Sequence, residues 1–165
     1  MARTTQLPSR RRNHLRQTAF ALTTGGILFF AALNASGTAQ ASELRVTIDG
    51  IRSDRGKVRV ALHKPVPDVK FPDASGTVAA QWRTAGLGAL EFVFADLPPG
   101  RFAVAVFHDE NDNDELDVNF IGIPKEGYAF SRDARGFAGP PSFDAAAVEI
   151  SEGDGPLSTT ATLGY

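Results

Sequence analysis

Apolar and polar side chains alternate one by one in several short segments after residue 42. A period of two is typical of β-strands that turn one face toward a core. The segments expected to form strands are 44–48, 56–63, 78–84, 89–97, 101–109, 145–150 and 159–165. The segment 101–109 is apolar on both faces, which predicts a central strand. About seven strands separated by turns predict an all-β fold, specifically an antiparallel β-sandwich.

Turn residues between these segments refine the prediction. The sequence RSDRG at 52–56 separates the first two strands and predicts that they form a β-hairpin. Pro98-Pro99-Gly100 predicts a tight turn, because proline presets φ and glycine accepts a positive φ. No window of ten residues has a convincing helical period, so only short helical pieces are expected, in 66–76 and 130–147.

The first 41 residues differ from the rest and contain no Asp or Glu. Five arginines precede a mostly apolar run at 18–33, and Ala39–Ala41 is a small-residue cleavage site, which is the pattern of a secretory signal peptide. Cleavage is expected after Ala41. An uncleaved membrane anchor is the alternative, although the apolar run is shorter than the ~20 residues of a spanning helix. The chain is therefore expected to be exported, to the periplasm or the extracellular space, by a Sec or a twin-arginine route.

The remaining segment, 42–165, has the length of a single domain. It carries 19 acidic and 12 basic residues, a formal charge of −7, and the chain has no cysteine. Nucleic acid and anionic membrane surfaces are disfavoured as partners by this charge. No disulfide is available, so stability must come from the core, with a bound metal as a further source.

Six acidic residues fall within the ten residues 108–117. Such density of like charge is unfavourable unless the loop is solvated or something positive lies in it. Oxygen-bearing side chains alternate along this loop in the spacing D-x-N-x-N-x-x-x-D, which suits a hard cation such as calcium. The candidate ligands are Asp109, Asn111, Asn113, Asp117 and the backbone carbonyl of Glu115.

The loop departs from known calcium loops in two ways, which keeps an ion-free acidic turn open as the alternative. Asp114 stands where a glycine usually makes the sharp turn, although Asp tolerates the left-handed conformation better than most residues. Phe120 stands where an EF-hand has its bidentate Glu. A calcium ion here is expected to bind weakly and to order the loop rather than to catalyse a reaction.

A second unusual stretch, 119–143, is long, rich in Gly, Pro and aromatic residues, and poor in strand pattern. Long loops are often functional. One interpretation is a surface that binds an envelope glycan, peptide or protein partner, or a small ligand. The other is a structural loop whose aromatic side chains cover one end of the sandwich. The candidate contact residues are Lys125, Tyr128, Phe130, Arg132 and Phe137.

The two histidines after residue 42, His63 and His108, support an alternative function. An envelope hydrolase would use His108 with neighbouring carboxylates, and it requires a pocket that brings a histidine to a carboxylate. No nucleophile elbow, thiol or phosphate-binding loop is present in the sequence. A non-enzymatic structural or binding module is therefore the preferred prediction, with no catalytic residue assigned.

Several motifs resemble known proteins. The pattern LPPG-x-aromatic-x-V at 97–104 is similar to transthyretin-like and immunoglobulin-like modules. Together with SDRGKVRVALH, FPDA, GPPSF and the run from Leu97 to Ser131, it resembles the bacterial exported family called domain of unknown function 2141, over about Leu44 to Ile150. The resemblance implies an exported β-sandwich and no assigned activity. That family's loop usually reads D-E-N-G-N-G-x-L-D, and Asp112 and Asp114 replace its two glycines here.

Overall fold

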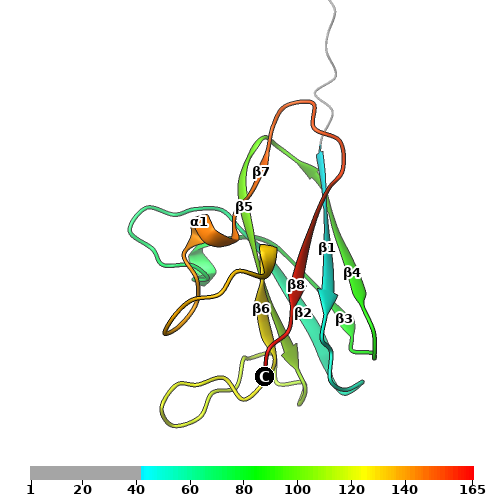
Figure 1. The fold of residues 1–165 in the computed structure, drawn as a ribbon, viewed down its shortest axis with the longest axis vertical. Coiled ribbons are helices and arrows are strands. Elements are labelled where there is room, and N and C mark those ends of the chain that lie inside the picture. The colour runs from blue at the N-terminus through cyan, green and yellow to red at the C-terminus, as the bar shows by residue number, and fades with distance from the viewer. Residues whose placement is uncertain (1–41) are drawn as a thin grey trace, which may run out of the picture. The chain divides into compact units, whose positions relative to one another are not determined.

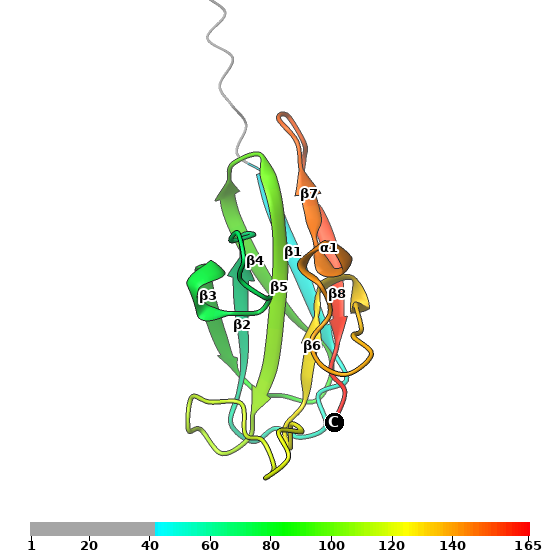
Figure 2. The same cartoon turned by 90° about the vertical axis from the view of Figure 1, so that its left-hand side faces the viewer.

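The computed structural model describes residues 42–165. The signal peptide predicted for residues 1–41 lies outside the described residues. Within them the chain forms eight strands in two sheets that lie face to face (Figures 1 and 2). The strands are β1 (Ser42–Asp49), β2 (Lys57–His63), β3 (Thr77–Thr84), β4 (Leu90–Leu97), β5 (Gly100–Asp109), β6 (Tyr128–Phe130), β7 (Val148–Ile150) and β8 (Leu157–Thr162). The predicted β-sandwich is confirmed, and β5 is central to its sheet.

One sheet has the order β4-β1-β8, and the other has the order β3-β2-β5-β6 with β7 pairing the start of β5. All pairs are antiparallel except β1 with β8, which is parallel. The predicted hairpin of β1 and β2 is wrong, because these strands belong to different sheets. The turn at 52–56 carries the chain from one layer of the sandwich to the other. Both strands still turn their apolar faces to the same core, which is why their alternation looked compatible with a hairpin.

The core between the sheets is made by the alternating apolar positions of the strands. Leu44, Val46 and Ile48 of β1 are fully buried there, as are Val58 and Leu62 of β2. Burial of each such side chain stabilises the fold by about 1.5–3 kcal/mol. The faces expected from the period of two are therefore the ones that pack.

Short elements account for the stretches without a clear pattern. The 3₁₀ turns η1 (Ala74–Gly76) and η2 (Ser131–Asp133) and the one-turn helix α1 (Phe143–Ala146) lie where short helical pieces were expected. Ser142 caps α1 by accepting a hydrogen bond from the backbone N–H of Ala145. This helix shortens the strand predicted at 145–150 to β7.

The outward face of the five-stranded sheet carries a second, smaller apolar cluster. Ala103, Phe130 and Ala146 are buried there, with Phe71 and Phe143 packed against them. Phe71 contacts Phe130 and Phe143 edge to face, with ring centroids 5.4 and 5.9 Å apart. Three connections project on this side of the sheet, at the left of Figure 1: the segments 64–76, 110–127 and 134–142. No helix within residues 42–165 has the length and apolarity needed to cross a membrane.

Candidate functional site

Three alanines from neighbouring strands lie side by side on the outward face of the five-stranded sheet. Ala61 of β2 is opposite Ala80 of β3 on one side and Ala105 of β5 on the other. Residues that are opposite in a sheet project from the same face, and Phe130 of β6 ends this row beside Ala105. Because three methyl groups fill little space, the row makes the floor of a hollow in the sheet surface.

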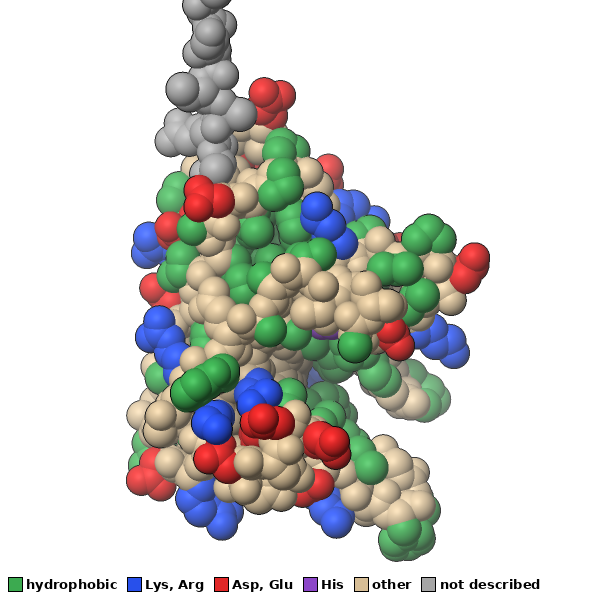
Figure 3. Space-filling view, turned by 180° about the vertical axis from the view of Figure 1, so that it is seen from behind, with side chains coloured by type: hydrophobic (Ala, Val, Ile, Leu, Met, Phe, Trp, Pro, Cys, Tyr) green, Lys and Arg blue, Asp and Glu red, His purple; other side chains and the backbone are tan. Residues whose placement is uncertain are grey.

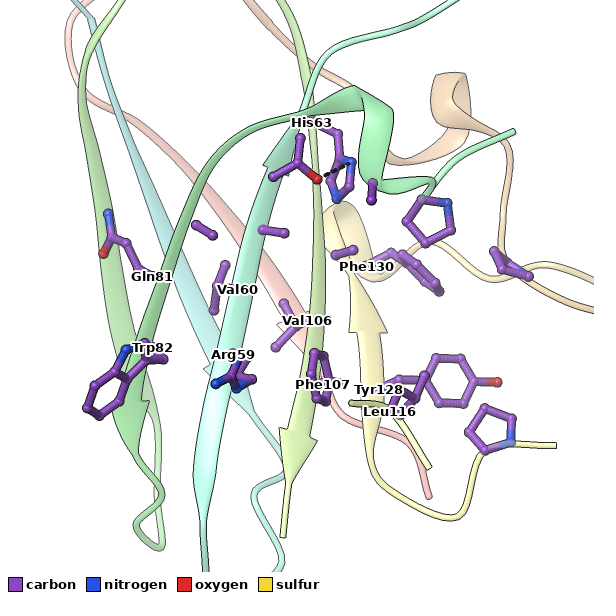
Figure 4. Close-up of a pocket in the computed structure, with 18 of the residues that line it drawn as sticks. Arg59, Val60, His63, Gln81, Trp82, Val106, Phe107, Leu116, Tyr128 and Phe130 are labelled. Atoms are coloured by element: carbon purple, nitrogen blue, oxygen red, sulfur yellow. Dashed lines mark hydrogen bonds between the residues drawn. The ribbon is translucent and has the colours of Figure 1, made fainter. Parts of the chain in front are cut away.

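The next row on the same face consists of large side chains. Arg59 lies between Trp82 and Phe107, and Tyr128 follows beside Phe107. These four residues form one wall of the hollow (Figure 4). The contrast between a row of alanines and a row of aromatic and arginine side chains, one pleat apart, is what gives the surface its depth.

All three projecting connections complete the hollow, which we call the groove, and Pro72 and Ala74 contribute from the segment 64–76. Leu116, Val118 and Pro124 contribute from the connection between β5 and β6, and Pro140 contributes from the segment 134–142. The groove has a volume of about 570 Å³, within the range of pockets that hold small molecules. In the space-filling view the surface is hollowed between these protruding segments, and hydrophobic side chains gather on them (Figure 3).

Most of the polar side chains that line the groove are engaged within the protein, and only the Tyr128 hydroxyl and the Trp82 N–H have no hydrogen bond to a described residue. Gln81 Nε2 donates to the Val93 carbonyl oxygen at 2.7 Å, and Thr77 Oγ1 lies 3.5 Å from His63 Nδ1. Arg59 pairs with the carboxylates of Asp109 and Asp114. A polar ligand would therefore lose its hydrogen bonds to water and find few replacements, which makes the groove selective for apolar groups.

His63 lies on the side of the groove opposite the row of Arg59 and Trp82 (Figure 4). It is buried and lies against Phe71, with ring centroids 5.2 Å apart at right angles. Burial lowers the pKa of His63, since the charged imidazolium is poorly solvated there. His63 is therefore neutral at pH 7 and behaves as part of the apolar lining.

The acidic loop, Asp109–Asp117, begins where β5 ends, beside the groove. Asp109 is fully buried, and its two carboxylate oxygens accept the backbone N–H groups of Asn113 and Asp114, each at 3.0 Å. Asp112 and Asp114 have positive φ, 63° and 69°. Asp thus supplies the left-handed conformation at both positions where the resembling family carries glycine.

Much of the negative charge in this loop is matched by the protein's own cations. Glu110 binds Arg52 and also lies 3.6 Å from Arg55, while Lys57 lies 2.7 Å from Asp112. The hydrogen bonds from Arg52 hold the pKa of Glu110 at about 2. Arg59, as above, pairs with two further carboxylates of the loop. These four basic side chains, which come from the β1–β2 connection and from β2, offset part of the repulsion between the like charges of the loop.

A buried glutamate outside the loop ties its two ends together. Glu126 accepts the backbone N–H of Glu110 on one oxygen at 2.8 Å and the backbone N–H of Asp117 on the other at 3.1 Å. It is nearly inaccessible to solvent. The role of Glu126 was not predicted from the sequence, since nothing in its spacing distinguishes it from a surface residue.

The predicted calcium ligands share one turn but are engaged with one another. Asn111 and Asn113 donate side-chain N–H groups to the Asp117 carboxylate at 2.8 and 3.3 Å. Their amide oxygens accept the backbone N–H groups of Asn113 and Glu115. Within residues 42–165 no three His, Cys, Asp or Glu side chains are grouped to hold a metal. The donor set of two carboxylates and two amides still has the chemistry of a hard-cation site, so calcium binding stays a prediction.

The two histidines lie far apart and on different faces. His108 is at the end of β5 opposite Val58 and points into the sandwich, whereas His63 is at the other end of β2 and points outward. Both ring nitrogens of His108 are occupied, by the Tyr165 hydroxyl and the Arg55 carbonyl oxygen, each at 2.8 Å. No carboxylate hydrogen-bonds either ring among the described residues. The constellation required by a histidine-based hydrolase is not assembled.

The predicted contact residues divide into two groups. Tyr128 and Phe130 line the groove, and Phe137 is fully exposed three residues before Pro140 of the groove wall. Lys125 and Arg132 do not line it: the side chain of Arg132 donates to the Ala147 carbonyl oxygen at 3.1 Å. The floor of the groove was not predicted, because the register that aligns Ala61 and Ala105 with Ala80 is not visible in the sequence.

Comparison with known proteins gives a family and no activity. A family model described as "uncharacterized protein conserved in bacteria", domain of unknown function 2141, matches residues 46–157. The match runs from β1 to the start of β8 and includes the acidic loop and every strand that forms the groove. No curated protein and no solved structure matches the chain.

Proposed function

The chain belongs to the bacterial family described as uncharacterized protein DUF2141, and from this starting point we propose that it is a non-enzymatic module of the cell envelope that binds an apolar ligand in the groove. The observation that carries the proposal is the row of three alanines beneath aromatic walls, with most of its polar neighbours engaged inside the protein. The composition of residues 1–41 supports export to the periplasm or the extracellular space.

The chain contains one tryptophan, and Trp82 lines the groove. Its fluorescence therefore reports on occupation of the groove without a label. We expect the amphiphilic dye 1-anilinonaphthalene-8-sulfonate, with its aromatic rings in the groove and its sulfonate in solvent, to quench Trp82 by energy transfer in a saturable titration. Ala105→Phe fills the floor with a ring and should weaken dye binding about tenfold or more.

Ala89→Phe is the matched control, since Ala89 is exposed in the loop between β3 and β4 and does not line the groove. It should leave dye binding unchanged. Equal affinities for the native protein, Ala105→Phe and Ala89→Phe would overturn the assignment of the groove as the binding site. Ala61→Leu provides a second filling variant if Ala105→Phe does not fold.

We further propose that calcium stabilises the acidic loop, with Asp109, Asn111, Asn113, Asp117 and the Glu115 carbonyl as ligands. The left-handed Asp112 and Asp114 and the closure of the loop by Glu126 support this, because they keep the donors within one turn. Binding would replace the hydrogen bonds that the two Asn amides donate to Asp117. Extracellular modules bind calcium at about 10⁻⁴–10⁻³ M, so at roughly tenfold excess the stabilisation is about 1.4 kcal/mol.

Calorimetric titration with Ca²⁺, Mg²⁺ and Zn²⁺ tests the metal proposal. We expect heat and a rise in melting temperature with Ca²⁺ only, reversed by chelator and lost in Asp117→Asn. The control is Asp144→Asn, an exposed carboxylate on α1 that pairs with Arg101. Absence of any calcium effect at millimolar concentration would show that the protein's own basic residues and hydrogen bonds suffice to stabilise the loop.

A further inference from the structure

Two phenylalanines are exposed almost without contact on the connections that wall the groove. Phe120 is 98% exposed and Phe137 is 107% exposed. Phe120 lies between Val118 and Gly122, which both line the groove, and Phe137 lies just before Gly139 and Pro140, which also line it. The two rings thus belong to two of the segments that border the groove.

Aromatic side chains held fully in water at loop tips are unfavourable in an isolated domain, and a contiguous apolar rim marks a binding surface. Ile121 and Ile123 add to the rim, at 64% and 54% exposure. Phe at the tip of a peripheral protein is suited to the boundary between headgroups and acyl chains in a lipid layer. A rim of Phe and Ile is less suited to a polar protein surface.

The groove behind this rim has the shape of a channel for a chain. Its floor crosses the sheet from β3 to β6, three strand spacings or about 14 Å. It is narrow along the strands, because Arg59 and its aromatic neighbours stand one pleat away on one side and His63 on the other. Among the described residues only the Tyr128 hydroxyl and the Trp82 N–H of the lining are unpaired, and they lie on β6 and β3, at the two ends of the groove. We therefore expect an apolar chain over the alanine floor and the polar group of the ligand at one end of the groove.

Charge narrows the choice of lipid surface. Residues 42–165 carry 12 basic and 19 acidic residues, and the basic side chains near the acidic loop are paired with it. An anionic lipid surface would repel this domain, whereas a zwitterionic one would not. Insertion must therefore depend on apolar contact.

We propose that the groove holds one acyl chain of a zwitterionic membrane lipid, and that Phe120 and Phe137 insert into the lipid surface from which that chain is taken. This inference rests on the proposed apolar binding site and names its ligand. It predicts that affinity rises with chain length, by about fourfold per methylene group while the groove is being filled, and then levels off.

The test uses the exported chain expected after cleavage, residues 42–165, and two lipid probes. The first is vesicles of phosphatidylcholine, with binding measured by flotation and by Trp82 emission. The second is lysophosphatidylcholine of increasing chain length, kept below its aggregation concentration. The Phe120→Ser/Phe137→Ser double variant should bind vesicles about tenfold more weakly or worse and bind the soluble lipid as the native protein does. Ala105→Phe should lose the soluble lipid.

Leu87→Ser is the matched control for the rim, because Leu87 is 76% exposed in the loop between β3 and β4 and does not line the groove. It should bind both probes normally. If the dye binds the groove but lysophosphatidylcholine does not bind at any chain length, the acyl-chain assignment is overturned while the apolar site stands. If neither binds, both proposals fail. Concentration-dependent self-association that the Phe double variant abolishes, without vesicle binding, would instead assign the rim to a second copy of the chain.

Discussion

The buried carboxylate of Asp109 lies 3.2 Å from Nε of Arg59. Asp109 is the first residue of the acidic loop, and Arg59 is the central side chain of the groove wall. The same carboxylate accepts two backbone N–H groups of the loop. One ion pair therefore links the conformation of the loop to the shape of the groove. A change in the loop conformation should alter the groove, and a change in the groove wall should alter the loop.

Replacement of Arg59 by Met should destabilise the protein strongly. Asp109 would remain as a buried carboxylate without its cation, a change that costs about 3 kcal/mol. Chemical denaturation measures the loss. Lys57→Met is the control, since Lys57 lies on the same strand but pairs with the exposed Asp112 and should cost less than about 1 kcal/mol. Equal losses in the two variants would show that burial of Asp109 does not matter.

The strands were predictable because their alternation follows from burial of one face, and this is a local property of the sequence. The sheet to which each strand belongs is not local. The turn at 52–56 has the composition of a hairpin turn, yet β2 finds better partners in β3 and β5. Strand β6 has three residues, too few to show a period.

The site was less predictable than the fold, for a related reason. The acidic loop and the aromatic stretch stood out by composition, and both lie beside the groove. The groove floor depends on register across three strands, and the loop's cations come from residues more than fifty positions earlier. Glu126 acts through two backbone N–H groups, which leave no trace in the residue types around it.

Replacement of Glu126 by Gln should open the acidic loop. The carboxylate accepts N–H groups at both ends of the loop, and the amide nitrogen of Gln would face one of these donors. The cost of one buried unsatisfied N–H is about 1–3 kcal/mol. Hydrogen exchange at the amides of Glu110 and Asp117 should become faster. Glu115→Gln, a change in an exposed side chain of the same loop, should leave both amides protected. If both amides stay protected in Glu126→Gln, the Glu126 carboxylate does not hold the two ends of the loop together.

Glu110 makes part of the stability dependent on pH. Its pKa is about 2 in the folded protein against an ordinary value of 4.5, mainly because of Arg52. A carboxyl group with a lowered folded pKa stabilises the protein above its unfolded pKa, and this contribution is lost as the pH falls from about 4.5 to about 2. The difference in unfolding free energy between native protein and Glu110→Gln should be constant from pH 7 to 5 and shrink below pH 4. A difference that stays constant to pH 2 would contradict the lowered pKa.

Tyr165 contributes to stability through a hydrogen bond to the buried His108. Burial raises the pKa of the Tyr165 hydroxyl, so it is protonated at neutral pH and donates to His108 Nδ1, while His108 Nε2 donates to the Arg55 carbonyl oxygen. Tyr165→Phe keeps the ring, which packs beneath Arg52, but leaves a buried imidazole nitrogen without a partner. The expected loss is about 1–2 kcal/mol.

Tyr128→Phe is the control, because the Tyr128 hydroxyl has no hydrogen bond to any described residue, and this variant should leave the free energy of unfolding unchanged. Nitrogen-15 spectra of His108 report on the same contact. The Nδ1 resonance should shift in Tyr165→Phe because Nδ1 loses its donor, while the Nε2–H held by the Arg55 carbonyl oxygen should persist; an unchanged Nδ1 resonance with unchanged stability would show that Tyr165 is dispensable.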